Sequence, residues 1–252
     1  LCFSGILNNF YYCIPSIFKN FINIFKKNGY EVDIFLYLNI INDKNKFKNN
    51  FKIINYNIEI KKILEILKPI DYIINNYNPN IQDKECKINN INFLNANYKN
   101  EQEKKYAING ICMYYKIFKC NQLKLNYEKK KKFKYDLVWR ARLDFKFLKE
   151  LEFPFDLYPF KNMSFIINDR YVFLSKRKNN DKFFGGSSEI MDKFCDIYNL
   201  IPDYYLSGLS LNGQILNKIR IRELKCKCHI IGHRNTYLKC KKTQKKKKRK
   251  KK

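Results

Sequence analysis

The sequence contains few of the residues on which many catalytic and binding sites depend. Its 252 residues include two histidines, three methionines, three alanines and one tryptophan. Both histidines, His229 and His233, lie near the carboxyl end, which excludes a histidine-based catalytic triad elsewhere in the chain. The small number of methionines excludes a methionine-rich binding surface.

Long apolar runs are also missing. No stretch reaches the roughly 18 uncharged apolar residues that a membrane-spanning helix needs. The opening segment, LCFSGILNNFYYCIPSIF, lacks the basic leading region and the small-residue cleavage pattern of a signal peptide. We therefore expect a soluble, cytoplasmic protein without a membrane span.

Acidic residues are in the minority, with 23 Asp and Glu against 51 Lys and Arg and a formal net charge of +28. Such a charge favours a nucleic-acid partner, because neutralised phosphates supply most non-specific affinity. However, 43 of the basic residues are lysines, whereas proteins that read nucleic-acid sequence usually depend on arginine. The accompanying excess of Asn, Ile, Tyr and Phe is typical of an AT-rich coding sequence. Nucleic-acid binding remains an alternative hypothesis, and the basic run 241–252 could also direct the protein to the nucleus.

Nine cysteines form an odd number, and most lie among apolar residues. This pattern predicts reduced thiols that fill the core, rather than a disulfide framework. One group near the carboxyl end differs, because Cys226, Cys228, His229, His233 and Cys240 together could supply four zinc ligands. The Cys-x-Cys spacing is not that of the usual zinc knuckle, which counts against a zinc site.

Apolar periodicity predicts alternating strands and helices in the first half of the chain. A strand over 1–7, a helix that begins near Pro15 and closes at Gly29, and a strand over 31–38 form one β-α-β unit. The expected elements that follow are a helix over 58–70, a strand over 71–77, a loop over 76–100, a helix over 101–131 and a strand over 135–139.

The second half continues with shorter elements. We expect a hairpin from strands 163–169 and 171–175, then a short strand closed by a double-glycine turn at 185–186, a helix from 187 to about 201, a helix over 213–219 and a last strand over 221–226. The predicted fold class is therefore α/β, with a mostly parallel central sheet flanked by helices. A single domain would cover residues 1–238, and a disordered Lys-rich tail would cover 239–252.

The stretch YDLVWRARLDFKF, residues 135–147, carries the clearest candidate site. Arg140, Arg142 and Asp144 alternate, so a strand would place all three on one face near its carboxyl end. A carboxylate in this position can bind Mg²⁺ or Mn²⁺, and guanidinium groups can hold phosphate oxygens. The alternative is an exposed strand with an ordinary Arg–Asp ion pair.

Two further stretches have features of anion-binding turns. In NNDKFFGGSSE, Asp181 is placed to act as a ligand or base, and Gly185 permits close backbone approach before a helix begins. In SGILNNF, Ser4 and Gly5 form a strand-to-helix turn that could hold a nucleotide. Either stretch could instead be only a tight turn.

The order of these three stretches resembles glycosyltransferase-like proteins that are common in large DNA viruses and in bacterial surface-polysaccharide loci. Such proteins look like members of the GT-A class, which has one α/β domain that binds a nucleotide sugar. The resemblance covers residues 2–225, and its most specific part is the motif YD-x-V-x-R-x-R-x-D.

This resemblance implies a role for each candidate residue. Asp144 would be the catalytic carboxylate and metal ligand near the sugar diphosphate, with Arg140 and Arg142 as diphosphate or structural partners. Asp181 and Gly185 would lie on the acceptor side, and Ser4 and Gly5 on the nucleotide side. The implied ligands are a nucleoside-diphosphate sugar, Mn²⁺ or Mg²⁺, and a glycan or protein acceptor.

The sequence departs from the family pattern at three places. Asn8 stands where an arginine is usual, Gly213 and Gln214 replace a late acidic position, and the Asn-Asp signal occurs twice, at Asp169 and Asp181. A non-catalytic relative of these transferases is therefore the alternative to an active enzyme.

Overall fold

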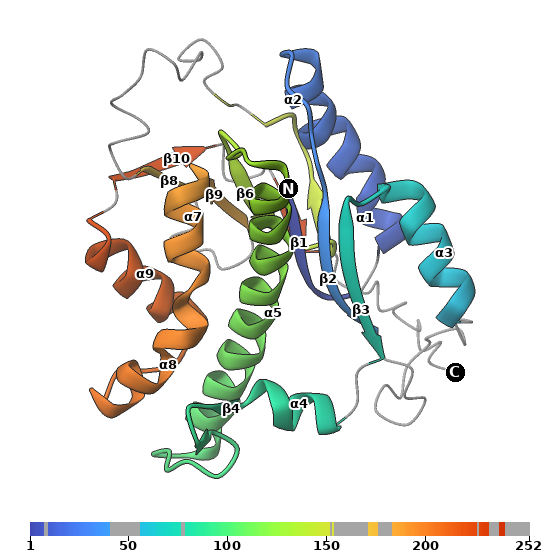
Figure 1. Cartoon of the computed structure of the whole chain (residues 1–252). Helices are drawn as coiled ribbons and strands as arrows, with labels where there is room; N and C mark the ends of the chain where they lie inside the picture. Colours follow the sequence, from blue (N-terminus) through green and yellow to red (C-terminus); the bar gives the residue numbers. More distant parts are fainter. Residues whose placement is uncertain are drawn as a thin grey trace, which may run out of the picture.

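A seven-stranded sheet forms the centre of the protein in the computed structural model (Figure 1). Its strand order is β10-β8-β9-β6-β1-β2-β3, and β9 is antiparallel to both of its neighbours while every other pair is parallel. The strands are β1 (Cys2–Ile6), β2 (Phe35–Ile40), β3 (Asp71–Asn76), β6 (Val138–Ala141), β8 (Tyr171–Ser175), β9 (Phe183–Gly186) and β10 (Lys227–Ile231). The predicted α/β class with a mostly parallel sheet is confirmed.

The structure describes most of the chain. Two small two-stranded sheets accompany the central one, β4 (Lys87–Ile88) with β5 (Ile91–Asn92), and β7 (Phe145–Phe147) with β11 (Tyr237–Lys239). The described residues are 1–7, 10–40, 56–76, 79–151, 153, 171–175, 183–225, 227–231 and 237–239.

Helices cover both faces of the sheet because side chains alternate along its strands. Phe3, Leu36 and Trp139 pack in the core beneath α1 (Phe10–Ile17), η1 (Phe18–Ile22), α2 (Asn23–Lys27) and α3 (Tyr56–Leu67). Phe35 and Phe184 pack in the opposite core beneath α5 (Glu101–Lys131), α7 (Ser188–Cys195), α8 (Ile197–Leu206) and α9 (Gly213–Glu223). In Figure 1, α5 runs along the sheet in green, with α7 to α9 in orange to its left and α1 to α3 in blue and cyan to its right.

The first β-α-β unit forms as predicted, although its helix is longer than expected. The helix begins at Phe10 instead of near Pro15, which lies inside α1. It closes where predicted, because Gly29 adopts a φ of +83° and donates its N–H to the Lys26 carbonyl at 3.1 Å.

The middle of this helix is a π-helical segment, η1, that holds β7. The side-chain amide of Asn20 donates to the Phe147 carbonyl at 2.8 Å, and the Asn20 carbonyl accepts from the Leu151 N–H at 2.8 Å. One turn earlier, the hydroxyl of Ser16 accepts from the Phe147 N–H at 3.0 Å. These three bonds fix the position of β7 against the helix.

The long helix α5 spans the predicted residues 101–131. The side chain of Asn100 accepts from the Glu103 N–H at its start, and Lys132 ends it with a φ of +57°.

A buried ionic cluster joins α5 to α7. Lys124 donates to Glu128 at 2.9 Å, to Ser188 at 2.6 Å and to Asp192 at 2.6 Å.

Three predictions about individual elements are wrong. Residues 76–100 are not a plain loop, because α4 (Pro79–Glu85) and the β4–β5 hairpin lie there. The two glycines at 185–186 belong to β9 rather than to a turn. The last strand is not 221–226, because α9 continues to Glu223 and β10 begins at Lys227.

Other predictions fall on residues that the structure does not describe. They concern the strand 163–169 and its hairpin, Asp169, and most of the carboxyl-terminal tail. The six cysteines whose side chains are described, at positions 2, 13, 86, 112, 120 and 195, are buried and form no disulfide, as expected of core thiols. Among the described helices, none has the length and apolar character needed to cross a bilayer.

Candidate functional site

The strand order reverses direction at β1, so β2 and β6 lie on opposite sides of this strand. From β1 the chain proceeds outward to β2 and β3, and it then returns to add β6 on the other side of β1. In open α/β sheets, ligands bind outside the carboxyl ends of the strands at such a reversal. The predicted residues Ser4 and Gly5 end β1, and Arg140, Arg142 and Asp144 end or follow β6.

Arg140 is the largest fully buried side chain of the described protein and connects the two strands. It is 1% exposed, and its Nε donates to the Ser4 hydroxyl at 3.2 Å. Its Nη2 lies 3.5 Å from the Ser4 carbonyl oxygen, and its guanidinium lies 5.8 Å from the ring centroid of Phe184. Burying a guanidinium is costly unless it is hydrogen-bonded, so this arrangement ties β6 to the end of β1.

Arg142 and Asp144 form a bidentate ion pair. Nε and Nη2 of Arg142 donate to the two carboxylate oxygens of Asp144 at 2.7 and 2.6 Å. The Asp144 side chain is only 3% exposed, whereas the Arg142 side chain is 22% exposed. The pair presents a cation rather than a carboxylate toward solvent.

This pairing corrects the predicted strand face. Since β6 ends at Ala141 and a turn at Leu143 and Asp144 precedes β7, Arg140 and Arg142 do not continue one strand into Asp144. The turn instead folds Asp144 back onto Arg142. The Arg–Asp ion pair that was predicted as the alternative is formed, but its Asp144 is buried, whereas that alternative expected an exposed strand.

Gly5 lies beside this pair and has a conformation that favours glycine. Its φ is +142°, and a side chain there would begin 4.0 Å from Cγ of Arg142. The β1–β6 register pairs Cys2 with Arg140 and Phe3 with Ala141, and Arg142 directly follows the last paired residue of β6. Four predicted residues, Ser4, Gly5, Arg140 and Arg142, are therefore brought together with Asp144.

Among the remaining predicted residues, Gly185 is described and is not part of this group. Gly185 pairs with Trp139 in the β6–β9 ladder, and a Cβ there would lie 2.5 Å from two atoms of the indole. Its lack of a side chain thus serves packing within the sheet. Asp181 lies outside the described residues, as do Cys226, His233 and Cys240, and nothing is described of the side chains of Cys228 and His229.

A second polar cluster lies at the same edge, at the ends of β2 and β3. Glu85 and Lys116 form a buried ion pair of 2.6 Å. Glu85 also accepts from the Asn39 amide at 3.0 Å, and the Asn39 amide oxygen accepts from Asn75 at 3.3 Å. Sequence analysis missed this cluster, because Glu85 fell in the segment interpreted as a loop and the asparagines are common throughout the chain.

A divalent cation does not fit the described residues well. Both oxygens of Asp144 are bonded to Arg142, so a metal ion would have to displace the guanidinium. Within the described ranges, no three His, Cys, Asp or Glu side chains form a group that could hold a metal. We therefore derive no step through a metal.

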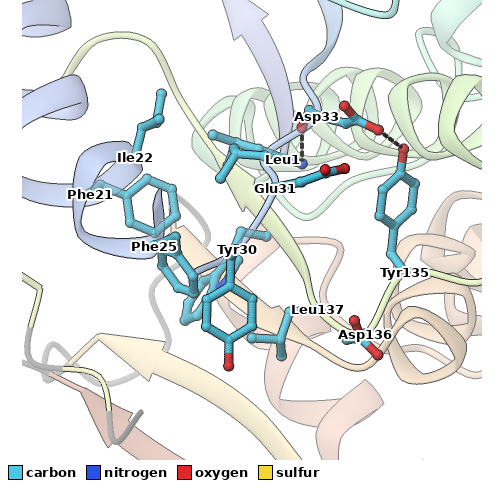
Figure 2. Close-up of a pocket in the computed structure, with 12 residues that line it drawn as sticks. Leu1, Phe21, Ile22, Phe25, Tyr30, Glu31, Asp33, Tyr135, Asp136 and Leu137 are labelled. Atoms are coloured by element: carbon cyan, nitrogen blue, oxygen red, sulfur yellow. Dashed lines mark hydrogen bonds between the residues drawn. The ribbon is translucent and has the colours of Figure 1, made fainter. Parts of the chain in front are cut away.

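One pocket lies at the opposite edge of the sheet, before the strands begin (Figure 2). Its volume of about 80 Å³ is well below the roughly 300–1,000 Å³ of sites that enclose a drug-sized ligand. None of the predicted site residues lines it. Glu31, Asp33 and Asp136 are its acidic residues, and the Tyr135 hydroxyl donates to Asp33 at 2.6 Å. Burial raises the pKa of Tyr135, and this bond to Asp33 raises it further.

The sequence matches no model of a known protein family and no curated protein. The functional assignment of this site therefore depends on its geometry and on the motif order of the sequence.

Proposed function

We propose that the protein is a GT-A-type glycosyltransferase that transfers a sugar from a nucleoside-diphosphate donor to an acceptor. The main support is the gathering of Ser4, Gly5, Arg140, Arg142 and Asp144 at the point where the strand order reverses. The four strands β3-β2-β1-β6 also follow the 3-2-1-4 order of nucleotide-binding α/β sheets.

The chemistry of the group suits a diphosphate leaving group. Cleavage of the sugar–phosphate bond leaves negative charge on the diphosphate, and a cation held in place stabilises that charge without reorganising. Arg142 is the partly exposed cation, and its two bonds to Asp144 leave further N–H groups for phosphate oxygens. Asp144 acts as the positioning residue that holds the guanidinium, and Gly5 leaves room beside it.

The buried cluster of Asn39, Asn75, Glu85 and Lys116 supports the nucleoside end of the same donor site. It lies at the ends of β2 and β3, next to the end of β1, and a nucleoside bound at the proposed site would lie beside it. The Glu85–Lys116 pair holds the Asn39 amide in a defined orientation, and through it the Asn75 amide.

Donor binding tests this proposal directly. A panel of nucleoside diphosphates, each with and without Mn²⁺, is added to the full chain, and thermal unfolding is followed. We expect one of them to raise the melting temperature, because a ligand that binds only the folded state stabilises it. Arg142→Gln should abolish the shift, whereas Arg222→Gln on the exposed face of α9 should keep it. If no nucleoside diphosphate stabilises the wild type, the proposal is wrong.

Catalysis is tested separately from binding. Asp144→Asn keeps the size of the side chain but replaces the charged bidentate pair with Arg142 by weaker, neutral hydrogen bonding. We therefore expect the rate of donor hydrolysis or sugar transfer to fall at least about tenfold while the fold remains. A wild type that binds the donor and turns over no sugar with any acceptor would instead support a non-catalytic relative. The closed Arg142–Asp144 pair is the observation that favours this second candidate.

A further inference from the structure

An exposed aromatic ring of α1 lies beside a cation of β7, the strand that directly follows Asp144. Tyr12 of α1 is 60% exposed. Lys146 of β7 donates to the Tyr12 hydroxyl at 3.1 Å, and its ammonium lies 4.2 Å from the ring centroid. Lys146 follows Asp144 by two residues, so this pair is close along the chain to the Arg142–Asp144 pair.

The position of the ring is fixed by buried contacts, although the ring itself is open to solvent. Ser16 and Asn20 hold Phe147 through bonds of 3.0 and 2.8 Å, and Tyr12 lies one helical turn before Ser16. Lys146 is thereby held against the same helix. The ring and the ammonium form a prearranged surface, which reduces the ordering cost of binding a ligand.

We propose that Tyr12 and Lys146 form the acceptor subsite of the transferase, and that the acceptor is an anionic oligosaccharide. This inference rests on the proposed function. The faces of sugar rings carry C–H groups that pack against aromatic rings, and a carboxylate, sulfate or phosphate on the sugar pairs with the ammonium. The net charge of +28 attracts such an acceptor from a distance.

Direct binding of short sugars to the full chain tests the subsite without requiring turnover. The probes are trigalacturonate, its neutral methyl ester, and a sulfated trisaccharide with its unsulfated form, titrated calorimetrically at about 150 mM salt to screen distant charges. We expect at least one anionic probe to bind about fivefold more tightly than its neutral counterpart. Tyr12→Ala and Lys146→Gln should each weaken that binding about three- to fivefold, and Tyr12→Phe should retain most of it.

Matched controls separate this subsite from general attraction to a basic surface. Tyr106→Ala removes a ring of α5 that is 51% exposed, and Lys149→Gln removes an exposed ammonium near Lys146. Both variants should bind the anionic probe as the wild type does. Equal weakening in the controls, or no binding of either anionic probe, would overturn the inference. The donor-induced thermal shift reports on the proposed function independently, because neither Tyr12 nor Lys146 belongs to the donor group.

Discussion

Arg140 and Arg142 are two residues apart but have different surroundings. Arg140 is enclosed between Ser4 and Phe184, so it acts within the sheet as a tie between strands. Arg142 leaves the strand, pairs with Asp144 and keeps part of its surface open. At the residue scale, the site therefore has a structural arginine and an arginine that can meet a ligand.

The glycine at position 185 gives a prediction about packing. Gly185→Ala would place a Cβ 2.5 Å from the Trp139 ring and 2.9 Å from the Val138 carbonyl oxygen. We expect a loss of about 1–3 kcal/mol in the free energy of unfolding, because the neighbouring backbone and the enclosed indole must shift. Urea denaturation measures the change.

Gly208→Asn is the control for this measurement. Gly208 has open space around it and a φ of +71°, which Asn tolerates better than other residues with a side chain. The control should lose less than about 1 kcal/mol. An equal loss in both variants would contradict the close contact between Gly185 and Trp139.

At the scale of elements, the junction between α4 and α5 contains two adjacent buried thiols. The Sγ atoms of Cys86 and Cys112 lie 3.6 Å apart. Their hydrogen bond raises the pKa of Cys112, and burial raises it further, so little thiolate is present at neutral pH. Cys112 is therefore a poor nucleophile while the fold stays closed.

This junction should nevertheless accept a cross-link under strong oxidation. With diamide, the two thiols lose two hydrogens to the reagent and form one disulfide, slowly because a thiolate must form first. Peptide mass spectrometry after digestion should find Cys86 joined to Cys112. Cys86→Ala should remove this product, and the absence of any Cys86–Cys112 peptide would contradict the placement of α4 against α5.

The elements also show what the sequence could and could not predict. The strands β1, β2 and β3 and the helix α5 follow from apolar periodicity, caps and glycine positions, which act over neighbouring residues. The helix α4 was missed because its seven residues, PNIQDKE, include a single large apolar side chain, Ile81, and so carry no apolar stripe. The candidate residues near β1 and β6 were found as motifs, and an Arg–Asp ion pair was one of the alternatives. The burial of Asp144 was not predicted, because a turn at Leu143 and Asp144 replaces the expected strand.

At the scale of the whole molecule, the excess positive charge makes each buried carboxylate important for stability. Glu128 accepts hydrogen bonds from Lys124, Lys134, Ser188 and the Tyr135 N–H, and it is 1% exposed. Burial alone would raise the pKa of Glu128, but these four donors outweigh it and lower the pKa below its usual value. The charged form of Glu128 thus stabilises the link between α5, α7 and β6.

The acid dependence of stability follows from this lowered pKa. The contribution of Glu128 is fully present above its unfolded pKa of about 4.3, and it is lost as the pH falls through the lower folded pKa. Glu128→Gln should cost about 3 kcal/mol at pH 7, and the difference from the wild type should shrink toward pH 3. Denaturation at several pH values measures it, with exposed Glu189→Gln as the control that should change little. A difference that does not depend on pH would contradict the role of the charge.

The net charge also predicts how the molecule behaves toward nucleic acids. If the lysines mainly reflect composition, binding to duplex DNA should be weak, independent of sequence and lost by about 200 mM salt. Deleting residues 241–252, which carry ten basic side chains, should flatten the salt dependence. Gel-shift titrations at increasing salt measure both effects. Tight binding that survives high salt or prefers one sequence would favour a nucleic-acid-binding protein instead.

The π-helical segment η1 lies between α1 and α2 and changes the direction in which the side chains of α2 point relative to those of α1. A one-residue deletion within Phe18–Ile22 would restore regular α-helical geometry and rotate the second half by about 100° relative to the first. Tyr12 and Ser16 would then no longer face β7 while Phe21 and Phe25 fill the core. The number of residues in η1 therefore determines which side chains of α1 face β7. An insertion or deletion in η1 would affect the proposed function even if every residue that contacts a ligand were kept.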